Sequence, residues 1–341
     1  MLQTVVGFIL LGIVVVLWVG SSTLIQTILE SENFNKPFFL TYFSTSNFTI
    51  YFIDVYRRRK DIKSGVLPDL KSTFKVAAQF CPLWFCANYF YNLSLTLTSI
   101  ASSTILSSTS GVLTLLLSIV LIKAKPDIFK FVAVLVSFGG TAMISLADTS
   151  YAGETAQGDI FALAGAVTYG LYCIFISAKG EKVYLVHMFA CVGLINFVCL
   201  MPFFLVLNYS GVEKFEFPSG EVLGFLFLNA IFGTVLSDVI WAFSVKYLNP
   251  ALSTLGISLT IPLSMLVDYL LHGMTYSGLY IAGAVLVILG FFIMAVFEHP
   301  KYGKIISNEG LKERFCNKRL KNQESMITKA GSFQDEVINR T

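Results

Sequence analysis

Charged residues are scarce in this chain of 341 residues. Asp, Glu, Lys and Arg together make up 13% of the sequence, whereas hydrophobic residues make up 55%. Soluble globular domains carry about 25% charged residues, so this balance excludes an ordinary water-soluble protein. The net charge is only +3, and no run of Lys and Arg is interleaved with aromatic residues. We therefore expect no nucleic-acid partner.

Residues and motifs of the common hydrolases are also missing. Three histidines are too few for a zinc-hydrolase site, and the chain has no His-Glu-x-x-His sequence. It has no Gly-x-Ser-x-Gly elbow and no glycine-rich phosphate loop. Asp238 and Asp268 lie in apolar stretches, but neither has the Gly-x-Gly-Asp or Tyr-Asp context of an intramembrane aspartyl protease. We predict that the protein is not an enzyme and uses no cofactor or metal.

No two cysteines have the Cys-x-x-Cys spacing of redox and metal sites. The six cysteines are Cys81, Cys86, Cys173, Cys191, Cys199 and Cys316. Five of them lie inside apolar stretches, which is typical of small buried hydrophobic residues. The N-terminus lacks a basic region and an A-x-A-like cleavage site, and its apolar run is too long for a signal peptide. We expect this run to remain as the first membrane span.

Long apolar stretches are what the chain has instead. A membrane-spanning helix needs about 20 predominantly apolar residues. Ten stretches meet this need, at residues 5–29, 37–55, 73–93, 99–122, 128–147, 158–177, 183–207, 221–245, 249–271 and 277–297. The sequence therefore predicts an all-α membrane protein with ten transmembrane helices.

The two halves of the chain repeat at an offset of 150 residues. The recurring pairs include Gly20 and Gly170, Ser94 and Ser244, Ala101 and Ala251, Ser103 and Ser253, and Gly140 and Gly290. Each half holds five spans, an odd number, so the second copy must enter the membrane with the opposite orientation. Two inverted repeats that face a shared midplane are typical of alternating-access carriers. We predict repeats at 1–147 and 158–297, joined by a lumenal linker at 148–157.

Basic residues are concentrated in alternate loops. The loop between spans two and three holds six Lys and Arg residues, whereas the loops on the opposite side hold only Lys36 and Lys214. Cytoplasmic loops carry the excess of positive charge, so both termini should be cytoplasmic. The polar residues 298–341 are predicted to form a disordered cytoplasmic tail, whose basic residues can contact anionic lipid.

Asp238 is the first candidate for a functional site because it lies well inside span eight. An ionisable group at that depth costs at least ~2.5 kcal/mol on insertion scales. Its counterpart at the repeat offset is Asn88. Trp84 and Tyr91 flank Asn88 at helical spacing, as Trp241 follows Asp238, which puts an aromatic and polar stripe on one face of each helix. The alternative is a structural role, in which Asp238 joins two helices.

Small polar residues in spans four and nine form a second candidate site. The candidates are Thr104 and Ser108 in span four, and their counterparts Thr254 and Ser258 in span nine. Small residues also allow helices to approach closely, so packing is an alternative explanation. Gly111 and Pro262 lie one position apart in the two copies, and an opening of the backbone there would be typical of a substrate site.

The ten-span layout, with ASSTILSSTS at residues 101–110, resembles the drug/metabolite transporter (EamA-type) superfamily. More narrowly, it resembles the F branch of solute carrier family 35, including fungal vacuolar-membrane members. Residues 18–22 (WVGSS) and 249–251 (NPA) are also similar, and the resemblance covers residues 1–297. It implies a central cavity lined by spans one, three, four, six, eight and nine. It also implies transport of nucleotide sugars, or of thiamine-like or nucleobase-like solutes, between cytoplasm and an organelle lumen.

The residues favour one of these substrate classes. A diphosphate in a low-dielectric cavity needs Arg or Lys, and no basic residue lies deep in a predicted span. The deep charge is acidic, and the aromatic residues Trp84, Tyr91, Tyr169 and Trp241 can either stack on a flat heterocycle or face lipid.

We therefore predict a secondary-active transporter of a cationic or neutral heterocycle, such as a vitamin or nucleobase-like metabolite. Protons are the candidate coupling ion, and a carboxylate inside the membrane is the group that would carry them. The vacuolar membrane is favoured, with the Golgi or another organelle as the alternative. A nucleotide-sugar antiporter and a non-transporting receptor or scaffold on the same fold are the alternative functions.

Overall fold

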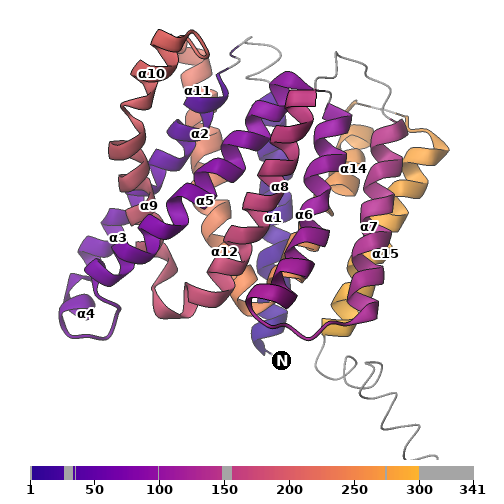
Figure 1. The fold of residues 1–341 in the computed structure, drawn as a ribbon, viewed down its shortest axis with the longest axis horizontal. Helices are drawn as coiled ribbons and strands as arrows, with labels where there is room; N and C mark the ends of the chain where they lie inside the picture. The colour runs from indigo at the N-terminus through magenta and orange to yellow at the C-terminus, as the bar shows by residue number, and fades with distance from the viewer. Residues whose placement is uncertain are drawn as a thin grey trace, which may run out of the picture.

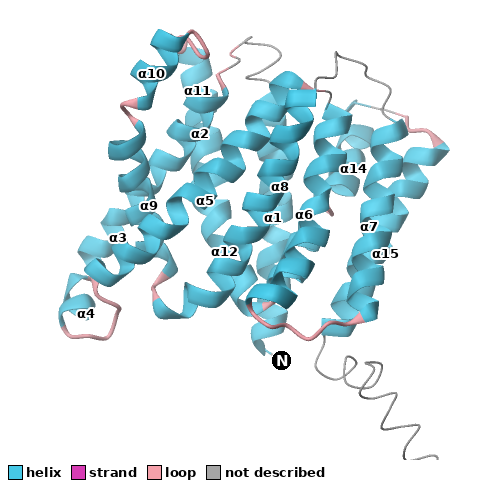
Figure 2. Cartoon of the chain, in the orientation of Figure 1, coloured by secondary structure: helices cyan, strands magenta, loops and turns pink. Residues whose placement is uncertain are grey.

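The computed structural model of the protein describes residues 2–26, 34, 36–98, 100–147, 156–272 and 275–298. Every regular element in these ranges is a helix, as Figures 1 and 2 show. The predicted all-α class is thereby confirmed. The predicted tail beyond Glu298 and most of the predicted linker lie outside the described residues, so both stay predictions.

Helices of the first half follow the first five predicted spans. They are α1 (Leu2–Gln26), α2 (Pro37–Ser46), the 3-10 helix η2 (Asn47–Tyr51), α3 (Phe52–Arg57), α4 (Arg59–Lys63), α5 (Leu70–Leu97), α6 (Ile100–Leu121) and α7 (Ile128–Ala147). Pro37 begins α2, where its fixed φ suits the first turn and its missing N–H is not needed. Asp69 caps α5 by accepting hydrogen bonds from two backbone amides of the first turn.

Helices of the second half follow the last five predicted spans but are interrupted more often. They are α8 (Ala156–Lys179), η3 (Gly180–Lys182), α9 (Leu185–Leu200), α10 (Phe203–Ser210), α11 (Gly220–Leu228), the π-helix η4 (Asn229–Leu236), α12 (Ser237–Tyr247), α13 (Pro250–Ile257), α14 (Thr260–His272) and α15 (Gly278–Glu298). Predicted span eight is therefore α11, η4 and α12 in succession. Predicted span nine is two helices with a turn between them.

Seven helical stretches of the described chain are long and apolar enough to cross a membrane, judged by length and composition. They are 3–22, 103–121, 128–147, 156–182, 220–247, 250–267 and 278–297. Helices α9 and α10, which are bent by 44°, would make an eighth span if they cross as one. Predicted spans two and three are helical but fall outside this set, because span two is interrupted and α5 carries many polar residues. The count of ten spans stays a prediction.

Helices α7 and α15, which occupy the same position in the two halves, pack closely and antiparallel (Figure 1). A methyl group on Gly140 would lie 2.6 Å from the carbonyl oxygen of Gly283. The equivalent contact recurs with the halves exchanged, because a methyl group on Gly290 would lie 2.7 Å from the carbonyl oxygen of Ala133. These two contacts, Gly140 with Gly283 and Gly290 with Ala133, show that α7 and α15 run antiparallel.

Predicted spans two and seven also cross each other. The side-chain amide of Asn196 on α9 donates a hydrogen bond to the hydroxyl of Ser46 on α2 at 2.8 Å, and these residues are 150 positions apart. Close to this bond, a methyl group on Gly193 would lie 2.5 Å from the backbone nitrogen of Thr49. The two helices therefore meet backbone to backbone between the two halves of the chain.

The loops separate by charge at the two ends of the helix bundle. The basic loop that contains α4 lies at the same end as the N-terminus and the α6–α7 connection, whereas the α10–α11 loop lies at the opposite end (Figure 1). This arrangement agrees with the predicted alternation of the loops. Which end faces the cytoplasm remains a prediction from the charge bias.

Candidate functional site

Asp238 lies in the first turn of α12, immediately after the π-helix η4. It is 5% exposed, and it is the only buried carboxylate among the described residues. Within that part of the chain no lysine or arginine is buried, and Asp238 forms no hydrogen bond or ion pair. The hydroxyl groups of Tyr51, Tyr169 and Tyr172 lie within electrostatic range of its carboxyl group. An unpaired carboxylate in such a place is costly, so Asp238 remains the first candidate for a functional residue.

An aromatic cluster lies beside Asp238, and Tyr172 of α8 is at its centre. The Tyr172 ring centroid is 5.1 Å from that of Trp84, 4.7 Å from that of Tyr169 and 5.4 Å from that of Trp241. Three of the predicted site residues, from α5, α8 and α12, are thus brought together. Sequence reasoning missed Tyr172, although it follows Tyr169 by three positions and so shares a helix face with it.

The cluster contains polar hydrogens that have no partner. The indole nitrogens of Trp84 and Trp241 are buried without a hydrogen bond in the described part of the chain. Leaving such a group unpaired costs about 1–3 kcal/mol each. A bound solute with hydrogen-bond acceptors would satisfy these groups, whereas the carboxylate of Asp238 would accept from a donor or pair with a cation.

The equivalent position in the first half is arranged differently. The amide of Asn88 donates to the carbonyl oxygen of Trp84 on its own helix at 2.9 Å. Tyr91 is 42% exposed and makes no ring contact with the cluster of Trp84, Tyr169 and Trp241 in the described structure. The predicted stripe on α5 is therefore divided, with Trp84 in the core and Tyr91 on an exposed part of the helix.

The small polar residues of spans four and nine bond mainly within their own helices. Thr104 and Ser108 are half-buried on α6, and Ser108 donates to the carbonyl oxygen of Ile105 at 2.7 Å. Thr254 is 5% exposed and donates to the carbonyl oxygen of Pro250 at 2.7 Å. Its hydroxyl is also 3.6 Å from the sulfur of Cys173 on α8. These bonds support packing as one role of the set.

The predicted opening of the backbone occurs in one half only. Span nine is interrupted by a turn at Ser258 and Leu259, shortly before Pro262 in α14. The same expectation for Gly111 is wrong, because α6 runs without a break from Ile100 to Leu121. Gly111 is buried against α7, with room for little more than a methyl group beside Val134, so neighbouring helices support the regular backbone.

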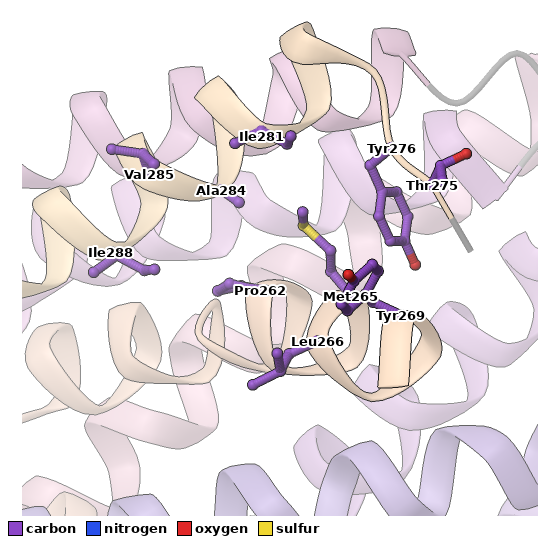
Figure 3. A pocket seen from close by; sticks show the side chains of 10 residues that line it. All are labelled: Pro262, Met265, Leu266, Tyr269, Thr275, Tyr276, Ile281, Ala284, Val285 and Ile288. Carbon is purple, nitrogen blue, oxygen red and sulfur yellow. The ribbon is translucent and has the colours of Figure 1, made fainter. Parts of the chain in front are cut away.

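A pocket of about 550 Å³ lies between α14 and α15, and Figure 3 shows the side chains of the two helices facing each other across it. It is lined by Pro262, Met265, Leu266, Tyr269, Thr275, Tyr276, Ile281, Ala284, Val285 and Ile288. The lining has no charged side chain and includes none of the predicted site residues. Several of its residues are exposed large hydrophobics, which is the surface expected towards lipid.

Comparisons with known proteins agree with this architecture. The EamA-like transporter family matches residues 5–146 and, separately, residues 156–296. An uncharacterised vacuolar membrane protein of Saccharomyces cerevisiae is 32% identical over 351 residues, which cover 84% of this chain and 89% of the relative. Solute carrier family 35 member F5 of Macaca fascicularis is 38% identical over 232 residues, which cover 66% of this chain and 54% of the relative.

A solved crystal structure has the same fold, with a TM-score of 0.65 at 18% identity, covering 87% of this chain and 97% of its own. The two family matches cover nearly all of the described residues, and the relatives confirm the resemblance seen in the sequence. The protein is therefore a multi-pass membrane protein of the EamA-like transporter family, related to the F branch of solute carrier family 35.

Proposed function

We propose that the protein is a secondary-active transporter of a cationic or neutral heterocycle, such as a vitamin or nucleobase-like metabolite, between cytoplasm and an organelle lumen. One observation carries this proposal. The only buried carboxylate of the described residues, Asp238, lies without a cationic partner beside a cluster of aromatic rings. A cation would be attracted both by the carboxylate and by the ring faces, and a neutral heterocycle would stack on the rings.

The alternating-access mechanism of this proposal needs two inverted repeats. The family matches the two halves separately, and the contacts of Gly140 with Gly283 and of Gly290 with Ala133 are equivalent contacts between antiparallel helices. A two-fold axis in the membrane plane would generate this pattern. It supports ten spans in two inverted repeats, with the site near the midplane between them.

Transport of a nucleotide sugar has less support from these residues. Its diphosphate needs Arg or Lys, and among the described residues every Lys and Arg lies outside the buried core. A carboxylate at the centre would also repel the phosphate oxygens. The vacuolar relative from yeast supports a vacuolar location, and the charge bias of the loops supports cytoplasmic termini.

Thermal stabilisation of the purified full-length protein would identify the solute class, because a ligand that binds only the folded state raises stability. The panel should contain cationic heterocycles, neutral nucleobases and nucleotide sugars. We expect a cationic or neutral heterocycle to stabilise the protein, and reconstituted liposomes to take up that solute faster than protein-free liposomes. Stabilisation by nucleotide sugars alone would contradict the substrate class, and binding without uptake would favour a receptor.

A further inference from the structure

The backbone immediately before Asp238 is unusual. Residues Asn229–Leu236 form a π-helix of eight residues between the α-helices α11 and α12. Wide helical turns of this kind are rare and occur frequently at functional sites. Asp238 follows the π-helix by two positions, so the register of the π-helix determines the direction in which Asp238 points.

Two side-chain hydroxyls bond to carbonyl groups of the π-helix. The hydroxyl of Tyr51 on η2 donates to the carbonyl oxygen of Val235 at 2.6 Å. The hydroxyl of Ser237 donates to the carbonyl oxygen of Gly233 at 2.6 Å and accepts a hydrogen bond from the indole nitrogen of Trp18 at 3.0 Å. Side chains that insert into the hydrogen-bond pattern of a helix in this way stabilise its irregular turns.

A third bond holds the beginning of the π-helix. The hydroxyl of Ser21 on α1 donates to the side-chain oxygen of Asn229 at 2.5 Å, and both residues are buried. Gly233 makes this approach possible, because a methyl group there would lie 2.2 Å from the Ser21 hydroxyl oxygen. The π-helix is therefore held directly by Ser21 and Tyr51 and, through the Ser237 hydroxyl, by Trp18, and all three residues belong to the first half of the chain.

Conversion of the π-helix to α-helix would change where Asp238 points. Each residue of an α-helix advances about 100° around the axis, so loss of the extra residue of a wide turn rotates the following helix by roughly that angle. The carboxyl group would then leave the neighbourhood of Tyr51, Tyr169 and Tyr172.

We propose that the π-helix Asn229–Leu236 is a register switch for Asp238, and that Tyr51 is the positioning residue that holds it in the register observed. This inference rests on the proposed role of Asp238 in transport. Tyr51 suits the task because it reaches across from the first half of the chain and contacts a backbone atom of the second half. A relative movement of the halves would break this contact and release the switch.

Few other groups can titrate around Asp238. Helix α12 packs against α1, η4, α8, α9 and α13, and α1, η4 and α13 carry no titratable side chain. The titratable groups in the surrounding core are Tyr51, Cys81, Tyr169, Tyr172, Cys173 and Cys191. His187 lies in the first turn of α9, and its Nε2 is 3.3 Å from the carboxylate of Asp54. A titration between mild acid and neutral pH that disappears in Asp238→Asn therefore belongs to Asp238.

The protein carries its own probe for this titration, because its three tryptophans, Trp18, Trp84 and Trp241, all belong to the core beside Asp238. Tryptophan fluorescence of the full-length protein in lipid nanodiscs should show a transition with pH that Asp238→Asn lacks. Tyr51→Phe removes one hydroxyl and should move the midpoint by about half a pH unit or more, because it changes the surroundings of the carboxyl.

Tyr42→Phe is the matched control. The Tyr42 hydroxyl donates to the carbonyl oxygen of Phe197 at 3.0 Å, so it also joins a helix of the first half to a backbone atom of the second. Among the described residues its ring packs on Phe38, Phe197 and Phe204, none of which belongs to the π-helix, so its loss should leave the midpoint at the wild-type value. An unchanged midpoint in Tyr51→Phe, or an equal shift in Tyr42→Phe, would overturn the proposal.

Hydrogen–deuterium exchange gives a second readout that needs no titration. Tyr51→Phe should accelerate exchange over residues 229–241 about tenfold, as expected for the loss of one net hydrogen bond, and leave α9 unchanged. If the wild-type fluorescence shows no transition that depends on Asp238, hydrogen–deuterium exchange decides between the outcomes. Exchange over residues 229–241 of Tyr51→Phe at the wild-type rate would then overturn the proposed register switch. Neither readout requires a solute. A failure of reconstituted liposomes to take up any solute would therefore contradict the proposed function without deciding the test of the register switch.

Discussion

The helix that carries Asn88 and the helix that carries Asp238 occupy the same position in the two halves, yet they differ in both backbone and chemistry. Helix α5 is a single α-helix with Pro82 inside it, and Asn88 bonds to its own backbone. The equivalent helix of the second half contains a π-helix, and Asp238 is left without a partner in the described chain. The repeat thus provides the scaffold, and departures from the repeat provide the candidate site.

The same contrast appears in spans four and nine. Helix α6 continues through Gly111, whereas span nine is interrupted at Ser258. In both of these pairs of equivalent spans, the irregular backbone lies in the second half. Irregular backbone inside a membrane is tolerated only where protein or a water-filled cavity surrounds it, so this half is where a solute and its polar groups would be accommodated.

The largest expected effect comes from moving the carboxylate to the other half. The double variant Asn88→Asp/Asp238→Asn keeps the number of carboxylates but should lose solute uptake by about 100-fold or more, a cost of about 2.7 kcal/mol in the barrier. Asn88 has neither the π-helix nor the unpaired surroundings of Asp238. Uptake into liposomes measures the effect, with Asp61→Asn on the exposed α4 as the control. Recovery of uptake relative to Asp238→Asn alone would show that the two halves are interchangeable.

Packing between α7 and α15 should, in contrast, be symmetric. Gly140→Ala and Gly290→Ala each place a methyl group against a backbone carbonyl of the other helix, at 2.6 and 2.7 Å. Both should destabilise the protein by about 3 kcal/mol, because overpacking against backbone cannot relax easily. Thermal unfolding checks this, with Gly139→Ala as the control, since a methyl group on Gly139 meets nothing within 4 Å. Very different losses for Gly140 and Gly290 would break the proposed symmetry.

A smaller effect is expected at the contact between α1 and the π-helix. Gly233→Ala places a methyl group 2.2 Å from the Ser21 hydroxyl and 2.7 Å from the side-chain oxygen of Asn229, both of which are side-chain atoms that can move. The loss of stability should be about 1–2 kcal/mol. Gly224→Ala in α11 meets nothing within 4 Å and should gain up to about 1 kcal/mol from helix propensity. Equal stabilities of the two variants would contradict the close approach of Ser21.

The smallest effect concerns Glu213, in the loop after α10. Burial raises the pKa of Glu213, although hydrogen bonds from the backbone amides of Phe38 and Phe39 at 2.9 and 3.0 Å, and the charge of Lys36, lower it. The folded protein therefore binds the proton more tightly than the unfolded chain. This contribution to stability is fully present below the unfolded pKa of about 4.3 and is lost as pH rises through the folded pKa.

Glu213→Gln should accordingly remove part of the stability that the wild type loses on going from mildly acidic to neutral pH. The loop is partly exposed and screened by solvent, so the difference should be below about 1 kcal/mol. Unfolding midpoints measured across this pH range would show it, with Glu216→Gln in the same loop as the control. A wild type that becomes more stable with rising pH relative to Glu213→Gln would contradict the sign.

Most helix positions could be predicted from the sequence, because apolar stretches of membrane length determine them. Residues 128–147 were predicted as a span and are α7. The three residues Trp84, Tyr169 and Trp241 were predicted for the site and lie in one aromatic cluster. Helical spacing and the repeat were sufficient for these assignments, since both depend on local sequence.

The π-helix and the exposure of Tyr91 could not be predicted in this way. The π-helix and the residue after it receive hydrogen bonds from Trp18, Ser21 and Tyr51, which are about 180 to 220 positions away in the chain and so leave no local signal. Tyr91 shares a helix face with Trp84 by spacing, but which part of that face is covered depends on the neighbouring helices. The prediction that the backbone opens at Gly111 was wrong for the same reason, because tertiary contacts override the flexibility of a glycine.

Uptake by Asp238→Asn with and without a proton gradient tests the role of Asp238 most directly. The asparagine is nearly isosteric with the aspartate, so the protein should fold and reconstitute like the wild type. We predict that uptake driven by the gradient is abolished. Solute exchange without a gradient would survive if Asp238 carries the coupling proton and would be lost if Asp238 binds the solute. Full uptake driven by the gradient in Asp238→Asn would contradict both versions and leave Asp238 a structural residue.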